Sequence, residues 1–231
     1  MTFSIAARCA RTSRLGIAIS SSSPAVAARC AHARAGVAAV ASQNITDPRL
    51  GHVALALIAA GAAPTNALGS LIASRPHMAH RQMTAIDANG RTAVFSGAGT
   101  LGVHATAEGR DCVAAGNLLA VADIPAEMVA SFEQSGDDDF GDRLVAALRV
   151  GLAAGGEAGP VHSAGLLIVD AVDWPVTDLR VDWDDDPIGR LAALWEIWKP
   201  QEAAYLERAL DPSAAPGFGA PGDERAEQFQ T

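Results

Sequence analysis

The sequence is short of aromatic residues, lysine and cysteine. Only 5% of its 231 residues are Phe, Trp or Tyr, and Lys199 is its single lysine. We therefore expect a core built from small side chains and close backbone contacts. The three cysteines, Cys9, Cys30 and Cys112, form no C-x-x-C motif. Such a scattered set argues against a disulfide framework or a zinc site and favours buried free thiols in a reducing compartment.

Positive charge and long apolar runs are also scarce. The formal net charge is −9 and the basic residues form no stripe, which argues against nucleic acid or an anionic membrane surface as a partner. The longest apolar stretch, residues 53–63, is too short to span a bilayer. Arg8, Arg11 and Arg14 interrupt the start of the chain, which lacks the apolar centre of a signal peptide. We therefore expect a cytoplasmic protein.

The spacing of apolar residues predicts strands joined by hairpins, with helices between groups of strands. Strands are expected at residues 2–9, 15–22, 35–42, 81–87, 91–97, 112–117, 162–171 and 179–182. Helices are expected at residues 50–60, 64–74, 125–134, 140–154 and 187–210. This order lacks the strict alternation of a doubly wound sheet and favours an α+β fold with antiparallel sheets covered by helices. We predict one domain, residues 1–210, and a flexible C-terminal tail, residues 211–231, rich in Pro, Gly and Ala.

Thr2 is the strongest candidate for chemistry. A small residue after the initiator Met favours removal of that Met, which would leave a free α-amine on Thr2. Such an amine has a pKa of about 8 and can take the proton from its own hydroxyl, and this pair is a recognised nucleophile and base for acyl transfer. If the first hairpin turns near Thr12, Thr2 lies beside Ser21 to Ser23. The alternative is that Thr2 is simply the second residue of an ordinary chain.

Seven blocks of the sequence, taken in order, resemble the DUF1028 family. They are TFSIAAR, LGIAISSSSPAVAA, ARAGVAAVASQN, RQM-x-AID-x-NGR-x-AVFSG, AAGNLL, HSAGLLIV and LRVD, and they cover residues 2 to about 198. That family resembles the N-terminal-nucleophile (Ntn) hydrolases in fold. The resemblance implies an αββα sandwich, in which two antiparallel sheets face each other between layers of helices. It also implies Thr2 as the nucleophile that attacks an amide or similar acyl carbon.

The family blocks contain the other candidates for a catalytic role. Ser21 fits its block better than the neighbouring serines do, and its hydroxyl could position the Thr2 amine or relay a proton. Asn117 ends a predicted strand, and its amide could donate to an oxyanion. The alternative for Asn117 is a strand-ending residue with left-handed backbone, and for Ser21 a polar loop at a strand end.

Six further residues are candidates for substrate binding. Gln43 and Asn44 end a predicted strand and could bind a substrate amide, and Ser163 is the second residue of the family block HSAGLLIV. Arginine binds carboxylates in a bidentate manner, so Arg81 and Arg180 are candidates for binding a substrate carboxylate. Asp182 could orient one of these arginines or the Thr2 amine. The alternatives are helix capping for the amides and surface ion pairs for the arginines.

The leading hypothesis is an Ntn-type amidohydrolase that cleaves a small amide, lactam or carbamoyl-like metabolite without metal or cofactor. No lysine lies near Thr2, so the mechanism of proteasome-type enzymes cannot be transferred in detail. The alternative hypothesis is a non-catalytic protein that binds a small molecule on the same scaffold. A predicted helix carrying Trp195, Trp198 and Tyr205 suggests a homodimer, unless these aromatic residues cover the protein's own sheet.

Overall fold

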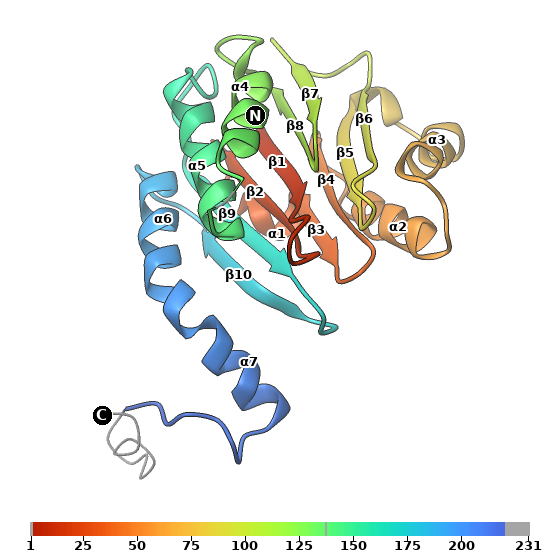
Figure 1. Ribbon diagram of the computed structural model, residues 1–231. Coiled ribbons are helices and arrows are strands. Elements are labelled where there is room, and N and C mark those ends of the chain that lie inside the picture. Colours follow the sequence, from red (N-terminus) through yellow and green to blue (C-terminus); the bar gives the residue numbers. More distant parts are fainter. Residues whose placement is uncertain (1, 137, 220–231) are drawn as a thin grey trace. The chain divides into compact units, whose positions relative to one another are not determined.

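The computed structural model describes residues 2–136 and 138–219 (Figure 1). The chain divides into two compact units, residues 1–192 and 193–231. The first unit contains every strand that the structure describes, together with helices α1 to α5. Part of the predicted flexible tail, residues 220–231, lies outside the described residues.

All strands pair in antiparallel sheets, as the sequence predicts. The larger sheet has six strands in the order β10-β9-β2-β1-β8-β7. Their bounds are β1 Thr2–Arg8, β2 Leu15–Ser21, β7 Ala105–Gly109, β8 Cys112–Asn117, β9 Ser163–Val169 and β10 Pro175–Val181. The smaller sheet has the order β3-β4-β5-β6, with bounds β3 Ala31–Arg34, β4 Ala38–Asn44, β5 Arg81–Asp87 and β6 Thr92–Ser96.

Helices cover the outer faces of two sheets that pack against each other (Figure 1). Helices α4 (Ile124–Gln134) and α5 (Phe140–Ala153) contact strands of the larger sheet. Helices α2 (Pro48–Ala59) and α3 (Pro64–Ser74) contact strands of the smaller sheet. Between the sheets, β1 and β2 contact β4, and β8 contacts β5. A short helix, α1 (Val26–Cys30), packs on β2 and β9.

Small side chains allow these layers to approach closely, as the composition predicts. Ala6 of β1 packs with Ala39 and Ile86 of the smaller sheet in one buried cluster. Gly16 of β2 sits where a Cβ atom would lie only 2.9 Å from the Leu167 carbonyl oxygen and from a Leu144 methyl group. Cys9, Cys30 and Cys112 are free thiols and all are buried, as expected from their scattered positions in the sequence.

The structure differs from the sequence prediction at short or polar elements. Helix α1 and strands β3 and β7 were not predicted, because each has only four or five residues and β7 (ATAEG) is only half-buried at the sheet edge. Strand β10 begins four residues earlier than predicted. The predicted last helix is divided into α6 (Pro187–Trp198), a 3-10 turn η2 (Lys199–Gln201) and α7 (Glu202–Leu210). Pro200 explains the division, because proline cannot donate the helical hydrogen bond.

Aromatic residues of the second unit contact one another. The ring centroids of Trp198 and Tyr205 are 5.0 Å apart, and the Arg208 guanidinium lies 4.0 Å from the Phe218 ring centroid. Tyr205 remains 41% exposed. The homodimer stays a prediction. Within residues 2–136 and 138–219, no helix has the length and apolar content needed to cross a membrane.

Candidate functional site

Four of the predicted site residues form one row across adjacent strands of the larger sheet. Thr2 of β1 pairs with Asn117 of β8, and Ser21 of β2 pairs with Ser163 of β9. The Thr2 hydroxyl lies 3.5 Å from the Ser21 hydroxyl, to which it donates. Directly opposed residues of an antiparallel sheet point to the same face. All four side chains therefore share one face, and none is more than 4% exposed.

Buried amides connect this row to the smaller sheet. Gln43 of β4 and Gln82 of β5 are register partners, and the Gln43 amide nitrogen donates to Gln82 Oε1 at 2.8 Å. The Asn117 amide nitrogen donates to the same oxygen at 3.0 Å, and the Ser4 hydroxyl donates to Gln43 Oε1 at 2.7 Å. Since Ser4 lies two residues after Thr2 on β1, the row of Thr2 faces the space between the two sheets.

The loop before β9 places a buried carboxylate beside this row. Glu157 is 4% exposed, and its Oε1 accepts a hydrogen bond from the backbone N–H of Ser22 at 3.0 Å. Glu157 also forms an isolated bridge with Leu119. Ser22 and Leu119 follow the ends of β2 and β8, the two strands that flank β1. Glu157 therefore lies near the N-terminal end of β1, where Thr2 begins the strand.

Only one of the two carboxylate oxygens of Glu157 has a hydrogen-bond partner among the described residues. Its Oε2 atom is buried and has no hydrogen-bond partner among the residues that the structure describes. Burial raises the pKa of Glu157, whereas the Ser22 hydrogen bonds and the positive charge of the chain's N-terminus act in the opposite direction. A buried carboxylate with a free oxygen is costly unless a donor or cation approaches it.

Ser21 and Ser163 also fix the turn that follows β2. The Ser163 hydroxyl donates to the Ser23 carbonyl oxygen at 2.6 Å and accepts from the Val26 N–H at 3.2 Å. The Ser21 hydroxyl accepts from the Ser23 N–H at 3.1 Å. Ser163 is thus held by backbone groups, whereas Ser21 links the same turn to the Thr2 hydroxyl.

The other four predicted residues lie apart from this row. Asn44, with φ of 73°, bridges the His80 carbonyl oxygen and the Leu101 N–H. Arg81 donates to the Ile45 carbonyl oxygen and lines a separate pocket of about 340 Å³. Arg180 lies on β10, two strands beyond β2, and forms an exposed ion pair with Asp178 at 2.7 Å. Asp182 is also exposed. The geometry gives these four no shared site with Thr2.

Sequence reasoning missed Gln82 and Glu157. The sequence did contain a clue to Gln82, because it is a polar residue inside a predicted strand and within the RQM block. No sequence pattern indicated Glu157, since it lies in a Gly-rich segment, Gly155-Gly156-Glu157, between a helix and a strand. Its position depends on the contact with Ser22, 135 residues away in the sequence.

The side chains of this cluster are hydroxyls, amides and one carboxylate. Hydroxyls can act as nucleophiles when a base is adjacent, amide N–H groups can stabilise an oxyanion, and a carboxylate can hold an ammonium group. Among the described residues, no group of three or more His, Cys, Asp or Glu side chains could hold a metal ion. Hydroxyls, amides and a carboxylate are also the groups that acyl-transfer sites use.

A family model and one solved structure assign the chain to the same family. No curated protein matches the sequence significantly. The solved structure of protein SPO2555 from Silicibacter pomeroyi, assigned to DUF1028, is 28% identical, with a TM-score of 0.82 over 88% of this chain and 89% of that chain. Anbu (ancestral beta-subunit) from Yersinia bercovieri matches 87% of this chain and 96% of its own at 9% identity and a TM-score of 0.39, too weak for any inference. Residues 2–191 match the DUF1028 family model, described as a family of unknown function, and the chain belongs to this family.

Proposed function

We propose that the protein is an Ntn-type amidohydrolase in which Thr2, freed by removal of Met1, is the nucleophile. The observation that carries the proposal is the row Asn117, Thr2 and Ser21, which faces the space between two sheets with Glu157 near its end. The arrangement of helices and sheets supports an Ntn-like αββα sandwich, in which the first residue of a central strand carries both nucleophile and base.

The reaction would begin at the Thr2 hydroxyl. Its oxygen attacks the carbonyl carbon of the substrate amide, and its proton passes to the Thr2 α-amine, directly or through a water. The C–N bond of the substrate then breaks, its electron pair stays on nitrogen, and the proton moves from the α-ammonium to that nitrogen. Water hydrolyses the acyl-threonine ester with the α-amine again as the base.

Asn117 and Glu157 would each assist Thr2. Only one of the two amide hydrogens of Asn117 is needed for the bond to Gln82, so the other can donate to the oxyanion of the tetrahedral intermediate. Glu157 Oε2 would accept a hydrogen bond from the α-ammonium of Thr2, which orients the amine and satisfies the free carboxylate oxygen. Glu157 is therefore a positioning residue in this mechanism.

The substrate class is a small amide, lactam or carbamoyl-like metabolite, handled without metal or cofactor in the cytoplasm. Gln43 and Ser163 belong to the same buried cluster and are the substrate-binding candidates that the geometry favours. The second candidate function is a non-catalytic small-molecule-binding protein on the same scaffold. It is favoured by the hydrogen bonds that already join the buried amides of Gln43, Gln82 and Asn117, because such a network can serve the structure alone.

Amide hydrolysis by four forms of the chain tests the proposal: the untagged protein, Thr2→Ala, Glu157→Gln and a form with residues added before Thr2. A panel of small amides and lactams supplies the substrates. The untagged protein should turn over at least one substrate, while Thr2→Ala and the extended form should lose activity by several orders of magnitude. Equal turnover by Thr2→Ala would refute the proposed nucleophile, and ligand binding without turnover in all forms would favour the binding protein.

The Glu157→Gln form separates positioning from a merely structural role. A carboxylate beside the Thr2 amine stabilises the ammonium, so its loss should lower the pKa of the amine. Because the free amine is the active form, the acid limb of the pH–rate profile should move to lower pH while the maximal rate falls. An unchanged profile with reduced stability would mean that Glu157 only supports the fold.

A further inference from the structure

A pocket lies at the end of β1 that is far from Thr2. It has a volume of about 340 Å³ and is lined from the β1–β2 turn, the β7–β8 turn and helices α4 and α5. Arg8, which lines it, is six residues from Thr2 on an extended strand, a separation of roughly 20 Å. The pocket is therefore separate from the row of Asn117, Thr2 and Ser21.

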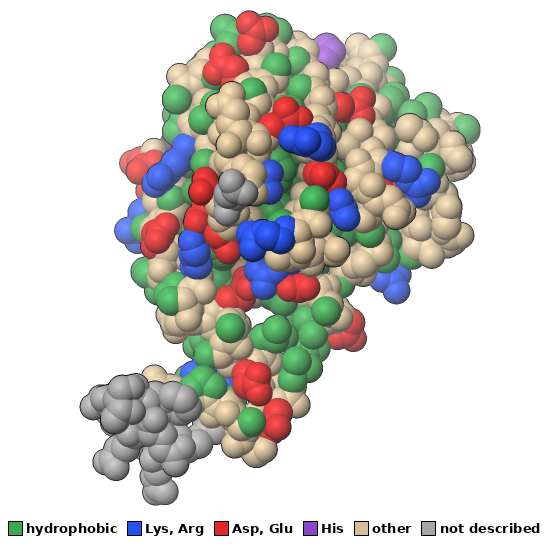
Figure 2. Space-filling model, viewed as in Figure 1, with side chains coloured by type: hydrophobic (Ala, Val, Ile, Leu, Met, Phe, Trp, Pro, Cys, Tyr) green, Lys and Arg blue, Asp and Glu red, His purple; other side chains and the backbone are tan. Residues whose placement is uncertain are grey.

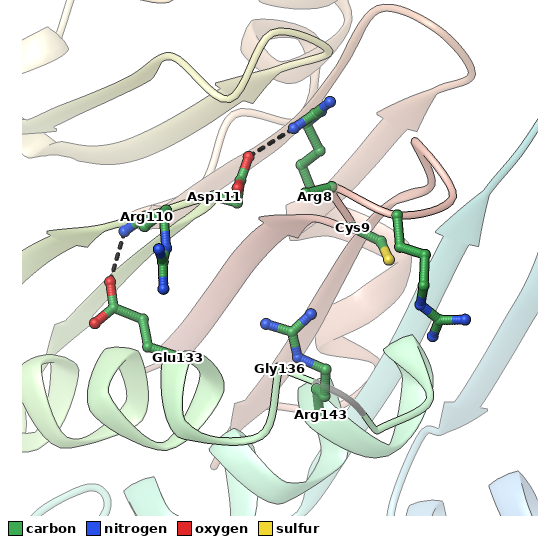
Figure 3. Close-up of a pocket in the computed structure, with 9 residues that line it drawn as sticks. Arg8, Cys9, Arg110, Asp111, Glu133, Gly136 and Arg143 are labelled. Atoms are coloured by element: carbon green, nitrogen blue, oxygen red, sulfur yellow. Dashed lines mark hydrogen bonds and ion pairs between the residues drawn. The ribbon is translucent and has the colours of Figure 1, made fainter.

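Arginines dominate the lining of this pocket, although the chain as a whole is acidic. Its lining includes Arg8, Arg11, Arg110 and Arg143. Figure 3 shows the Arg143 side chain rising from α5 and the Arg110 side chain descending from the β7–β8 turn into the same space. On the face shown in Figure 2, basic and acidic side chains are otherwise interspersed. Like charges that point into one pocket repel each other unless an anion lies between them.

The two carboxylates in the lining are already engaged. Asp111 Oδ1 lies 2.8 Å from Arg8 Nη1, so this pair neutralises Arg8. Glu133 Oε1 accepts a hydrogen bond from the backbone N–H of Arg110 at 2.6 Å, not from its guanidinium. Within the described part of the chain, the guanidinium groups of Arg11, Arg110 and Arg143 form no ion pair with a carboxylate.

Arg143 is the strongest indication that a ligand completes the pocket. It is only 8% exposed, and its Nε and Nη2 donate to the Phe132 carbonyl oxygen while its guanidinium lies 3.8 Å from the Phe132 ring centroid. Burial lowers the pKa of Arg143, while the charges of Cys9, Cys112, Asp111 and Asp138 act in the opposite direction. The Phe132 contacts fix the orientation of the guanidinium but supply no negative charge. A buried cation without an ion-pair partner is costly, and an anion in the pocket would reduce that cost.

We propose that this pocket binds a small molecule through an oxyanion group, phosphate or carboxylate, held by Arg11, Arg110 and Arg143. A planar guanidinium presents paired N–H donors that match both kinds of oxyanion in bidentate geometry. The pocket volume is at the lower end of the range for small-molecule sites, so it has room for more than an inorganic ion. The site is independent of the proposed hydrolase activity.

Calorimetric titration of the full chain with inorganic phosphate and with citrate, at constant ionic strength, tests this site. The test variant is Arg11→Gln/Arg110→Gln, because both side chains are exposed and their replacement leaves the core intact. The matched control is Arg34→Gln/Arg149→Gln, which removes the same charge at exposed positions outside the pocket. Urea unfolding of each variant verifies that it is folded.

The wild type should bind at least one of the two anions at one site per chain. The test variant should bind it about tenfold or more weakly, while the control should bind it as the wild type does. Preference for phosphate or for citrate identifies the oxyanion, and either preference supports the site. Absence of binding to the wild type, or equal weakening in the test and control variants, would overturn the proposal.

Discussion

Replacing Gln82 by Met should expose how much the two sheets depend on the amide network between them. Gln82 is fully buried and makes four hydrogen bonds. Methionine is similar in size but keeps none of them. The variant leaves the Gln43 and Asn117 amide N–H groups without their acceptor, at about 1–3 kcal/mol for each buried group. We expect a loss of about 3 kcal/mol or more in the free energy of unfolding, measured by urea denaturation followed by circular dichroism.

A double-mutant cycle and a control on the same strand make this prediction specific. Gln43→Met combined with Gln82→Met removes both partners together, so the pair should cost at least about 1 kcal/mol less than the sum of the single losses. Thr84 is also buried on β5, and its hydroxyl has no hydrogen-bond partner among the described residues. Thr84→Val should therefore be neutral or stabilising. A loss below about 1 kcal/mol for Gln82→Met would mean that the amide network contributes little to stability.

Two further predictions concern the contact between His32 and helix α2. Burial, and secondarily His52, lowers the pKa of His32 from 6.5 to about 4, so folded protein resists its protonation. As the pH falls from 6.5 to 4, the buried neutral His32 should lower the free energy of unfolding by about 3 kcal/mol. Between these pH values, urea unfolding should therefore show about 3 kcal/mol less loss of stability for His32→Gln than for the wild type. The second prediction concerns Gly51, where a Cβ atom would lie 2.1 Å from His32 Cδ2. Gly51→Ala should destabilise by about 1–3 kcal/mol in the same assay, and His32→Ala should relieve the clash; an unaltered midpoint would contradict this packing.

The sequence was most informative where pattern and position coincide. The alternation of residues along β1 and the hairpin after it were enough to predict that Thr2 lies beside Ser21 to Ser23. The structure pairs Phe3 with Ser20 and places the Thr2 hydroxyl 3.5 Å from that of Ser21, the first of these serines. Helix α3 has the predicted bounds, because Pro64 marks its start and the chain turns extended at Arg75. Local signals of this kind act within a few residues, where propensity and hydrogen bonding decide the structure.

Contacts between distant segments were beyond the sequence. Glu157 reaches the site through Ser22, and the arginine pocket gathers residues from turns and helices that are far apart in the chain. Arg81 and Arg180 were chosen because arginine is suited to binding carboxylates, and their role in substrate binding stays a prediction. In the structure, Arg81 donates to a backbone carbonyl oxygen and Arg180 pairs with the neighbouring Asp178. Residue type predicts which groups a side chain can bind, whereas the fold determines which groups lie next to it.

The intact mass of the protein, expressed without any N-terminal tag, shows directly whether Thr2 can be the nucleophile. An N-terminal nucleophile requires a free α-amine on Thr2. The proposed mechanism requires a mass that lacks one methionine and an N-terminal peptide that begins at Thr2. A chain that retains Met1 in full would contradict the proposed mechanism and leave the row of Asn117, Thr2 and Ser21 as part of a binding site or of the fold alone.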